Sequence, residues 1–273
     1  MTFAKRLPGL LPRALAATAL AATALSAAAV TSSADARTLD AIKQRGRLMV
    51  CANPDALPFS SKKGDRRGFE LELGEALAKE LGVALEVGWV IFPVHVARVD
   101  CDILFDSIVD RETAEDAHLR LSKPYTVSGV AIALRPGTEG INGFGDLKKG
   151  QRVGAIVGSL ASVKLGQKGL ATIPFTFEDE MLDALGKGEI DVALATPSTI
   201  GYYNITHKDA PLRLVHDYDT MPELRWEVAV GIRKADDALV QAINTALDHM
   251  LADGVVHSIY ASYGVEQSLP AKP

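Results

Sequence analysis

The chain has 273 residues, of which 23% are charged and 48% hydrophobic, and its formal net charge is −5. This length suits one large domain or two lobes of ordinary size. An acidic chain without a stripe of Lys and Arg is poorly suited to nucleic acid or to an anionic membrane, so we expect neither as a partner.

The first 36 residues are typical of an export signal. Three basic residues precede an Ala/Leu-rich run over 14–30, and an Ala-x-Ala triplet ending at Ala36 offers a cleavage point. We therefore expect residues 1–36 to be a cleaved signal peptide and the mature protein to be periplasmic. The alternative is an uncleaved membrane anchor. No later apolar run is long enough to span a bilayer.

The first part of the mature chain alternates strands and helices. Thr38 is suited to cap a first helix and Gly46 to end it, while Gly82 ends a second helix that begins at Phe69. The apolar patterns predict helices over 39–45 and 69–81, with strands over 47–51, 83–91 and 101–105. Strands separated by helices indicate a parallel sheet, and its ligands bind at the carboxyl ends of the strands.

The second part of the chain contains two long β-rich runs, 125–134 and 226–233, which we interpret as paired crossings between two lobes. Between them the patterns predict strands over 151–157, 175–176 and 191–195 and helices over 160–165 and 178–185. Two further helices follow, around 239–251 and 255–263. The predicted division is a discontinuous first lobe, 37–130 plus 229–273, and a second lobe, 131–228.

The two cysteines, Cys51 and Cys101, would both enter an oxidising compartment, where a disulfide is the default expectation. The predicted strands argue against it, because Cys51 ends one strand and Cys101 begins another. Opposite ends of parallel neighbours would lie roughly 10–15 Å apart, whereas a bridge needs Cα atoms within about 7 Å. The sequence leaves this pairing open.

Three blocks in order suggest a family. They are Pro58-Phe59 with Gly68-Phe69-Glu70-Leu71-Glu72-Leu73; Val153-Gly154 with Gly158-Ser159 and Gly188-Glu189-Ile190-Asp191; and Arg233-Lys234 with Ala252-Asp253-Gly254. They resemble the periplasmic solute-binding proteins of the amino-acid type, family 3. The resemblance implies the two-lobed α/β fold of type 2 periplasmic binding proteins, in which each lobe is a mostly parallel sheet flanked by helices and two strands cross between the lobes.

At several positions that contact the ligand in this family, the present chain has a different type of residue. The acid of the first loop falls on Asn53, the stacking aromatic falls near Ala56, and the acid of the second lobe falls on Thr196. The family arginine falls near residues 114–115, so Arg111 is either a displaced anion clamp or a solvated surface side chain. The ligand-binding residues implied are Asn53, Phe59, Ser107, Arg111, Gly158, Ser159 and Thr196. A small anionic or non-zwitterionic solute is therefore expected rather than an α-amino acid.

The short segment 90–100 and the motifs 50–54 and 57–60 also resemble the J-type accessory proteins of quinoprotein methanol dehydrogenases. Three functions follow from these resemblances: a solute-binding protein for an inner-membrane ABC-type importer, an accessory factor of a periplasmic PQQ-dependent dehydrogenase, and a dehydratase-like enzyme. The six histidines have no metal-ligand spacing, and only His95 lies where it would reach a cleft. We expect a monomeric, non-enzymatic protein without cofactor or metal.

Overall fold

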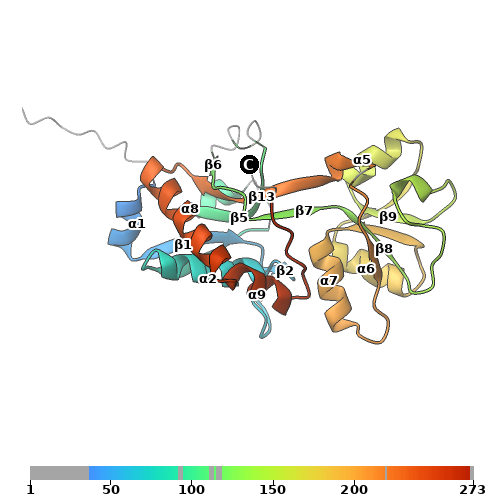
Figure 1. The fold of residues 1–273 in the computed structure, drawn as a ribbon, viewed down its shortest axis with the longest axis horizontal. Helices are drawn as coiled ribbons and strands as arrows, with labels where there is room; N and C mark the ends of the chain where they lie inside the picture. Colours follow the sequence, from blue (N-terminus) through green and yellow to red (C-terminus); the bar gives the residue numbers. More distant parts are fainter. Residues whose placement is uncertain (1–36, 92–94, 111–113, 115–118, 219, 271–273) are drawn as a thin grey trace, which may run out of the picture. The chain divides into compact units, whose positions relative to one another are not determined.

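The computed structural model describes residues 37–91, 95–110, 114, 119–218 and 220–270. The predicted signal peptide, 1–36, lies outside the described residues, as does Arg111. The described chain forms two large sheets flanked by helices (Figure 1) and a small two-stranded one, which confirms the predicted α/β fold. The predicted lobe boundaries near 130 and 228 stay a prediction.

The first lobe is built on a sheet with the order β4-β1-β5-β13-β6, in which β7 also pairs with β13. Its strands are β1 (Arg47–Ala52), β4 (Ala84–Trp89), β5 (Ile103–Ile108), β6 (Leu119–Leu121), β7 (Thr126–Gly129) and β13 (Arg225–Arg233). Strands β4, β1 and β5 are parallel, and β13 is antiparallel to its neighbours. The helices are α1 (Leu39–Arg45), α2 (Phe69–Glu80), α3 (Val96–Val99), α8 (Asp237–Ala252) and α9 (Val255–Ser262).

The second lobe is built on a sheet with the order β10-β9-β11-β8-β12. Its strands are β8 (Ala131–Leu134), β9 (Val153–Ile156), β10 (Thr172–Phe175), β11 (Val192–Ala195) and β12 (Arg213–Val215). Its helices are α5 (Leu160–Gln167), α6 (Glu178–Gly186) and α7 (Pro197–Thr206), with short 3-10 turns at η2 (Phe144–Asp146) and η3 (Pro222–Leu224). The sequence patterns did not predict α7 or β12.

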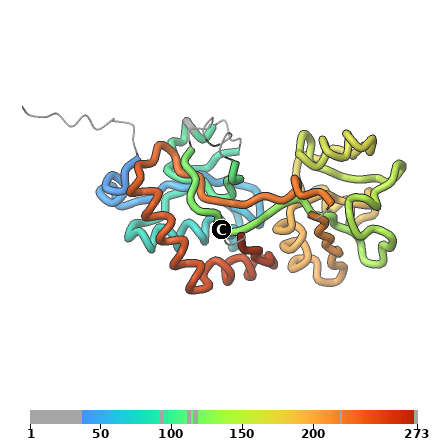
Figure 2. The backbone as a smooth tube through the Cα atoms, turned by 45° about the horizontal axis from the view of Figure 1, so that its top comes forward, coloured from blue at the N-terminus to red at the C-terminus, as the bar shows by residue number. Residues whose placement is uncertain are grey.

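Two crossing segments connect the lobes, as the β-rich runs predicted. The run over 125–134 divides between the sheets, because β7 pairs with β13 in the first sheet and β8 pairs with β11 in the second. Strand β13 runs antiparallel beside β7, from Arg225 opposite Gly129 to Val228 opposite Thr126 (Figure 2). Trp226 on β13 packs against the cores of both lobes, so its indole lies at the connection between them.

Local sequence explains where the first helices begin and end. Thr38 Oγ1 accepts a hydrogen bond from Ala41 N at 3.0 Å, and Gly46 ends α1 in the left-handed region. Gly68 precedes α2 at φ 95°, and a Cβ there would lie 2.3 Å from the carbonyl oxygen of Phe59. The Gly-Phe motif is therefore required because the loop and the helix start come too close for any side chain at 68.

The structure joins Cys51 and Cys101 in a disulfide with a Cα–Cα distance of 5.5 Å. The objection raised by the predicted strands was wrong because it assumed that the two strands start level with each other. Strand β5 begins at Ile103, which lies opposite Val50 near the end of β1. The start of β5 is thus level with the end of β1, and Cys101 lies within bonding distance of Cys51.

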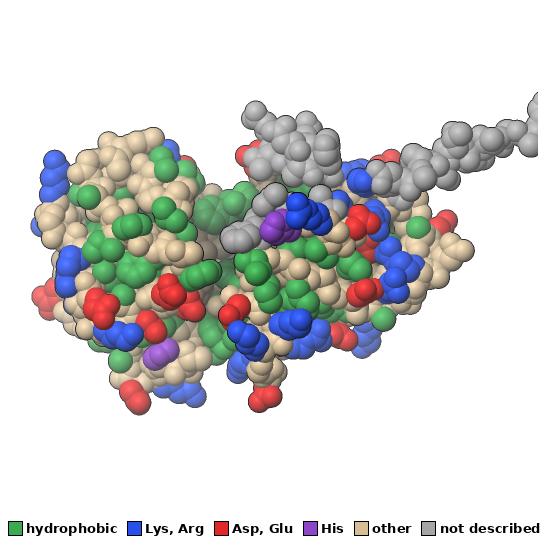
Figure 3. Space-filling model, turned by 180° about the vertical axis from the view of Figure 1, so that it is seen from behind, with side chains coloured by type: hydrophobic (Ala, Val, Ile, Leu, Met, Phe, Trp, Pro, Cys, Tyr) green, Lys and Arg blue, Asp and Glu red, His purple; other side chains and the backbone are tan. Residues whose placement is uncertain are grey.

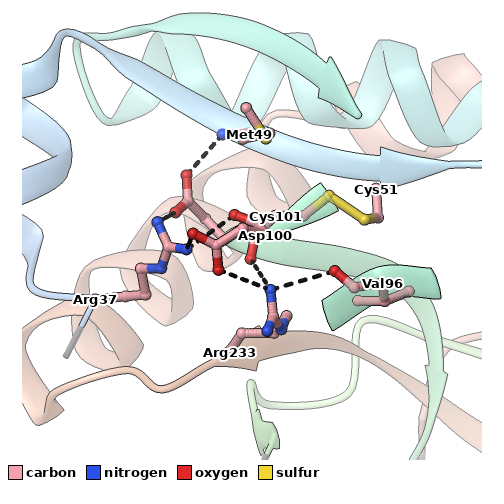
Figure 4. Close-up of a disulfide and its surroundings, with 8 residues drawn as sticks. Arg37, Met49, Cys51, Val96, Asp100, Cys101 and Arg233 are labelled. Carbon is pink, nitrogen blue, oxygen red and sulfur yellow. Dashed lines mark hydrogen bonds and ion pairs between the residues drawn. A yellow bond between two sulfur atoms is a disulfide. The ribbon is translucent and has the colours of Figure 1, made fainter. Parts of the chain in front are cut away.

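A group of charged side chains fixes the turn that carries Cys101 (Figure 4). The Asp102 carboxylate is fully buried; its Oδ2 accepts from Met49 N at 2.8 Å and pairs with Arg45, and its Oδ1 lies 3.2 Å from Arg37 Nη1. Arg37 also pairs with Asp100, and Arg233 Nη1 donates to the carbonyl of Cys101 at 3.0 Å. The cations from outside the turn neutralise its two acids and hold it against β1.

Candidate functional site: a cavity between the lobes

The first-lobe side of the site is the loop that follows β1. Asn53 Oδ1 accepts from Asp55 N at 2.9 Å, which closes a local turn before the short pair β2 (Asp55–Ala56) and β3 (Ser60–Ser61). The ring of Phe59 packs on Phe69 with centroids 5.0 Å apart, so it is anchored in the first-lobe core. Both residues therefore have defined positions at the carboxyl edge of the first sheet.

The second-lobe side consists of helix starts at the carboxyl ends of parallel strands. Ser159 caps α5 after β9 and Thr196 caps α7 after β11; their hydroxyl oxygens accept from Ser162 N at 3.2 Å and Thr199 N at 3.3 Å. Gly158 before Ser159 has φ 71°. The sequence thus correctly placed polar groups at this edge, and both hydroxyl groups are first of all helix caps.

A third residue at this edge, Glu178, is acidic, and the sequence patterns did not point to it. Glu178 begins α6, and its carboxylate accepts from Thr196 N (Oε1, 2.8 Å) and from the Thr196 hydroxyl (Oε2, 2.8 Å). Burial raises the pKa of Glu178, while the hydrogen bonds from Thr199 and Thr196 oppose that rise. A carboxylate therefore lies beside Thr196, where the resemblance implied that the acid had been lost.

The two sides enclose a cavity of about 270 Å³ between the lobes. The first lobe contributes Asn53, Asp55, Ala56, Leu57 and Phe59, and the second contributes Ile156, Thr176, Phe177, Glu178, Asp179, Thr196 and Thr199. Three predicted ligand residues, Asn53, Phe59 and Thr196, are thus brought together. The described residues lining the cavity include three acids and no Lys, Arg or His. Asp55 pairs with Lys63 outside the lining (Nζ–Oδ2 3.3 Å), so the negative charge of the cavity comes from Glu178 and Asp179.

The other predicted ligand residues that the structure describes lie outside this cavity. Gly158 and Ser159 do not line this cavity, and Ser107 Oγ donates to the carbonyl of Leu104 within its own strand at 3.4 Å. Ser107 also faces Gly231 of β13, where a Cβ would lie 2.4 Å from its hydroxyl oxygen. These positions as ligand contacts stay predictions.

Elsewhere in the first lobe, two carboxyl groups share a buried environment. The Tyr125 hydroxyl donates to Asp106 Oδ1 at 3.0 Å, and Asp106 adopts the left-handed region at φ 53°. Burial raises the pKa of Asp106 to about 6, opposed by the bond from Tyr125. Burial and the charge of Asp106 raise the pKa of Glu70 to about 8. The pair therefore keeps a proton at pH values where an isolated carboxyl group would be ionised.

Comparisons with known proteins identify the fold's family. The sequence pattern of the bacterial extracellular solute-binding proteins, family 3, matches residues 48–266. The chain belongs to this family. None of the helices in the described part of this family 3 protein has both the length and the apolarity needed to cross a bilayer.

Individual relatives of this family 3 protein are amino-acid binders by name. The L-cystine-binding protein TcyJ of Escherichia coli (strain K12) is 29% identical over 238 residues, covering 82% of this chain and 85% of TcyJ. A probable histidine-binding protein of Neisseria gonorrhoeae is 28% identical over 228 residues, covering 78% and 81%. The structure of an ancestral cationic amino acid solute-binding protein superposes with a TM-score of 0.71 at 25% identity, covering 83% and 99%.

Proposed function

We propose that this chain is a periplasmic solute-binding protein that holds a small organic solute in the cavity between its lobes and delivers it to an ABC-type importer in the inner membrane. The observation that carries the proposal is the Glu178–Thr196 pair, which faces Asn53 and Phe59 across the cavity. A carboxylate held by two hydrogen bonds at a shared sheet edge is a preorganised partner for one charged group of a ligand.

The charge of the cavity favours a solute with an ammonium group. Asp55, Glu178 and Asp179 line it, and no described basic side chain does. An ammonium group would lower the cost of keeping the half-buried Glu178 ionised, whereas a carboxylate would raise it. The anionic solute expected from the sequence depends on Arg111, which lies outside the described residues. The relatives named for cystine and histidine, whose ligands carry ammonium groups, also support an ammonium-bearing solute.

Thermal melting of the chain without residues 1–36 tests this proposal. The panel contains amino acids, primary amines without a carboxylate, and organic acids without an amine. A ligand at 100 times its Kd adds about 2.7 kcal/mol, which corresponds to a rise in Tm of roughly 5–10 °C for a chain of this size. A rise with ammonium-bearing members supports the proposal. A rise in Tm with organic acids alone would support an anionic solute instead. No rise in Tm with any member of the panel would contradict solute binding.

One observation favours a second candidate, the protein-binding accessory factor of a PQQ-dependent dehydrogenase. Large apolar side chains are exposed on both lobes (Figure 3), and Ile91, which is 62% exposed, and Phe177, which is 52% exposed, line one depression of about 470 Å³. Val157 and Leu160 flank the Gly158–Ser159 turn and are exposed as well. Apolar surface of this kind is typical of protein contacts.

The accessory function predicts a direct complex with a quinoprotein alcohol dehydrogenase. Size-exclusion chromatography of the two purified proteins measures it, with Phe177→Ser as the test variant and exposed Leu269→Ser as the control. A complex that Phe177→Ser abolishes and Leu269→Ser retains supports this function. Separate elution of the two wild-type proteins would contradict the accessory function.

A further inference from the structure

A second and larger cavity lies at the connection between the lobes. Its volume is about 620 Å³, within the range of small-molecule sites. It is lined by β7, the first residue of β13, one side of α7, Tyr260 of α9 and the segment 264–268 that follows α9. It shares no lining residue with the cavity that contains Glu178 and Thr196. We call it the hinge pocket.

The hinge pocket is held in shape by close backbone contact between the lobes. A Cβ on Gly201 of α7 would lie 2.1 Å from the carbonyl oxygen of Gly264, and a Cβ on Gly129 would lie 2.4 Å from the carbonyl oxygen of Leu224. Both contacts require glycine, because any side chain would push the segments apart. The walls of the pocket are thus fixed by backbone rather than by flexible side chains.

Charges of both signs enter the hinge pocket without neutralising each other. Asp106 and Glu266 contribute carboxylates, and Arg225 contributes a guanidinium. Within the described part of the chain, neither Arg225 nor Glu266 forms a salt bridge. Among the same residues, the side chain of Asp106 accepts one hydrogen bond, from the Tyr125 hydroxyl. The Asp106 carboxylate therefore has acceptor capacity left.

Some uncharged polar groups of the pocket already form hydrogen bonds within the protein, and others remain for a ligand. Both ends of the Asn204 amide are used by Leu212, with bonds of 2.9 and 2.7 Å. His216 Nδ1 lies 3.2 Å from the Tyr218 hydroxyl. The hydroxyls of Ser128 and Ser198 line the pocket and make no side-chain hydrogen bond within the described residues. The groups that remain for a ligand are thus two hydroxyls, one cation and two acids.

We propose that the hinge pocket is a second ligand site, which binds a small zwitterion with its ammonium group at Asp106 and its carboxylate at Arg225. A ligand with both charges satisfies both protein charges, whereas a ligand with a single charge leaves one of them unpaired. Because both lobes and both crossing strands line the pocket, a ligand there also favours one arrangement of the lobes and is coupled to binding in the Glu178 cavity.

The proposal does not depend on the function of the Glu178 cavity, so the two are tested separately. Isothermal titration calorimetry of the chain without residues 1–36 uses linear ω-amino acids from glycine to 6-aminohexanoate as probes. The matched alkylamines and alkyl carboxylates carry only one of the two charges. The variants are Arg225→Gln and Asp106→Asn in the hinge pocket, Glu178→Gln in the other cavity and the exposed Glu139→Gln as a control. Asparagine at 106 keeps an acceptor for Tyr125, and Arg225 is exposed, so both pocket variants retain the fold.

We expect at least one ω-amino acid to bind the wild type and the Glu178→Gln and Glu139→Gln variants equally. Its affinity falls roughly 10-fold or more in Arg225→Gln and in Asp106→Asn, since a charge-assisted hydrogen bond contributes about 1.5–3 kcal/mol. We expect the matched alkylamines and alkyl carboxylates to bind the wild type no more tightly than the ω-amino acid binds Arg225→Gln or Asp106→Asn. Absence of binding by every ω-amino acid overturns the proposal. Binding that Glu178→Gln abolishes and Arg225→Gln leaves unchanged overturns it too.

Discussion

The carboxylate of Glu178 accepts hydrogen bonds from both the backbone N–H and the hydroxyl of Thr196, each at 2.8 Å. The two residues are 18 positions apart and come together because α6 and α7 start at the same edge of the second sheet. Thr196 thus serves as the cap of α7 and as a donor to the acid. One hydroxyl group therefore both caps helix α7 and holds the carboxylate that we propose binds the solute.

Replacing Thr196 with alanine is expected to cost about 0.5–2 kcal/mol, because α7 loses its N-cap and Glu178 loses a donor. Thr196→Ser keeps both bonds and should be close to wild type. Urea unfolding followed by circular dichroism measures both variants. Equal stability of the alanine and serine variants would show that the hydroxyl has no structural role.

Buried Asp102 should be the most sensitive charged position in the first lobe. Asp102→Asn leaves Arg37 and Arg45 without their buried counter-charge, and breaking such a group costs about 3–5 kcal/mol. Asp237→Asn is the control, since that acid is almost fully exposed beside Arg120 and an exposed pair contributes about 0–1 kcal/mol. If both variants unfold at the same urea concentration, the network around the Cys101 turn does not stabilise the fold.

The disulfide closes a segment with a sequence separation of 50 residues. Cross-links of this kind typically stabilise by about 2–4 kcal/mol, mainly by restricting the unfolded chain. The double variant Cys51→Ala/Cys101→Ala should therefore melt well below the oxidised wild type. The wild type in reducing agent should approach the same Tm. A wild type whose Tm does not respond to reducing agent, together with an unchanged double variant, would contradict a stabilising bridge.

Glu70 should make the fold less stable as the pH rises. Its pKa is about 8 in the folded chain and near 4.5 when unfolded, so the folded state binds a proton that the unfolded state releases. Its contribution is fully present below pH 4.5 and is lost progressively as the pH rises to 8. Glu70→Gln should flatten this decline and raise the Tm at pH 8, by roughly 2–4 °C for each kcal/mol gained. Glu75→Gln on the exposed side of α2 is the control and should keep the wild-type slope.

The sequence predicted much of the fold because its helices carry strong local signals. Thr38, Gly46 and Gly68 mark helix ends by side-chain capping or positive φ, and the structure confirms each of them. Two of the missed elements lack such signals: α7 has little amphipathic pattern because it contacts both lobes, and β12 is only three residues long at a sheet edge. The start of β5 was misplaced because a buried acid, Asp102, precedes it in an apolar run.

The site was predicted less completely than the fold. Residue-by-residue transfer placed polar groups at the correct strand ends, as Thr196 and Asn53 show. It missed Glu178 because the acid comes from a different helix start, that of α6 after β10, and only the spatial order β10-β9-β11 brings that helix start to Thr196. An acidic first residue directly after a predicted strand was the available signal. The resemblance to the family placed the acid at position 196 instead.

The central claim is that the Glu178 carboxylate holds an ammonium group of the solute. Isothermal titration calorimetry of the tightest ligand from the melting panel, against wild type, Glu178→Gln and exposed Glu139→Gln, tests it most directly. We predict an ammonium-bearing ligand whose affinity falls roughly 10-fold or more in Glu178→Gln and stays unchanged in Glu139→Gln. A ligand without an amine, or one that binds Glu178→Gln as tightly as wild type, would contradict the account.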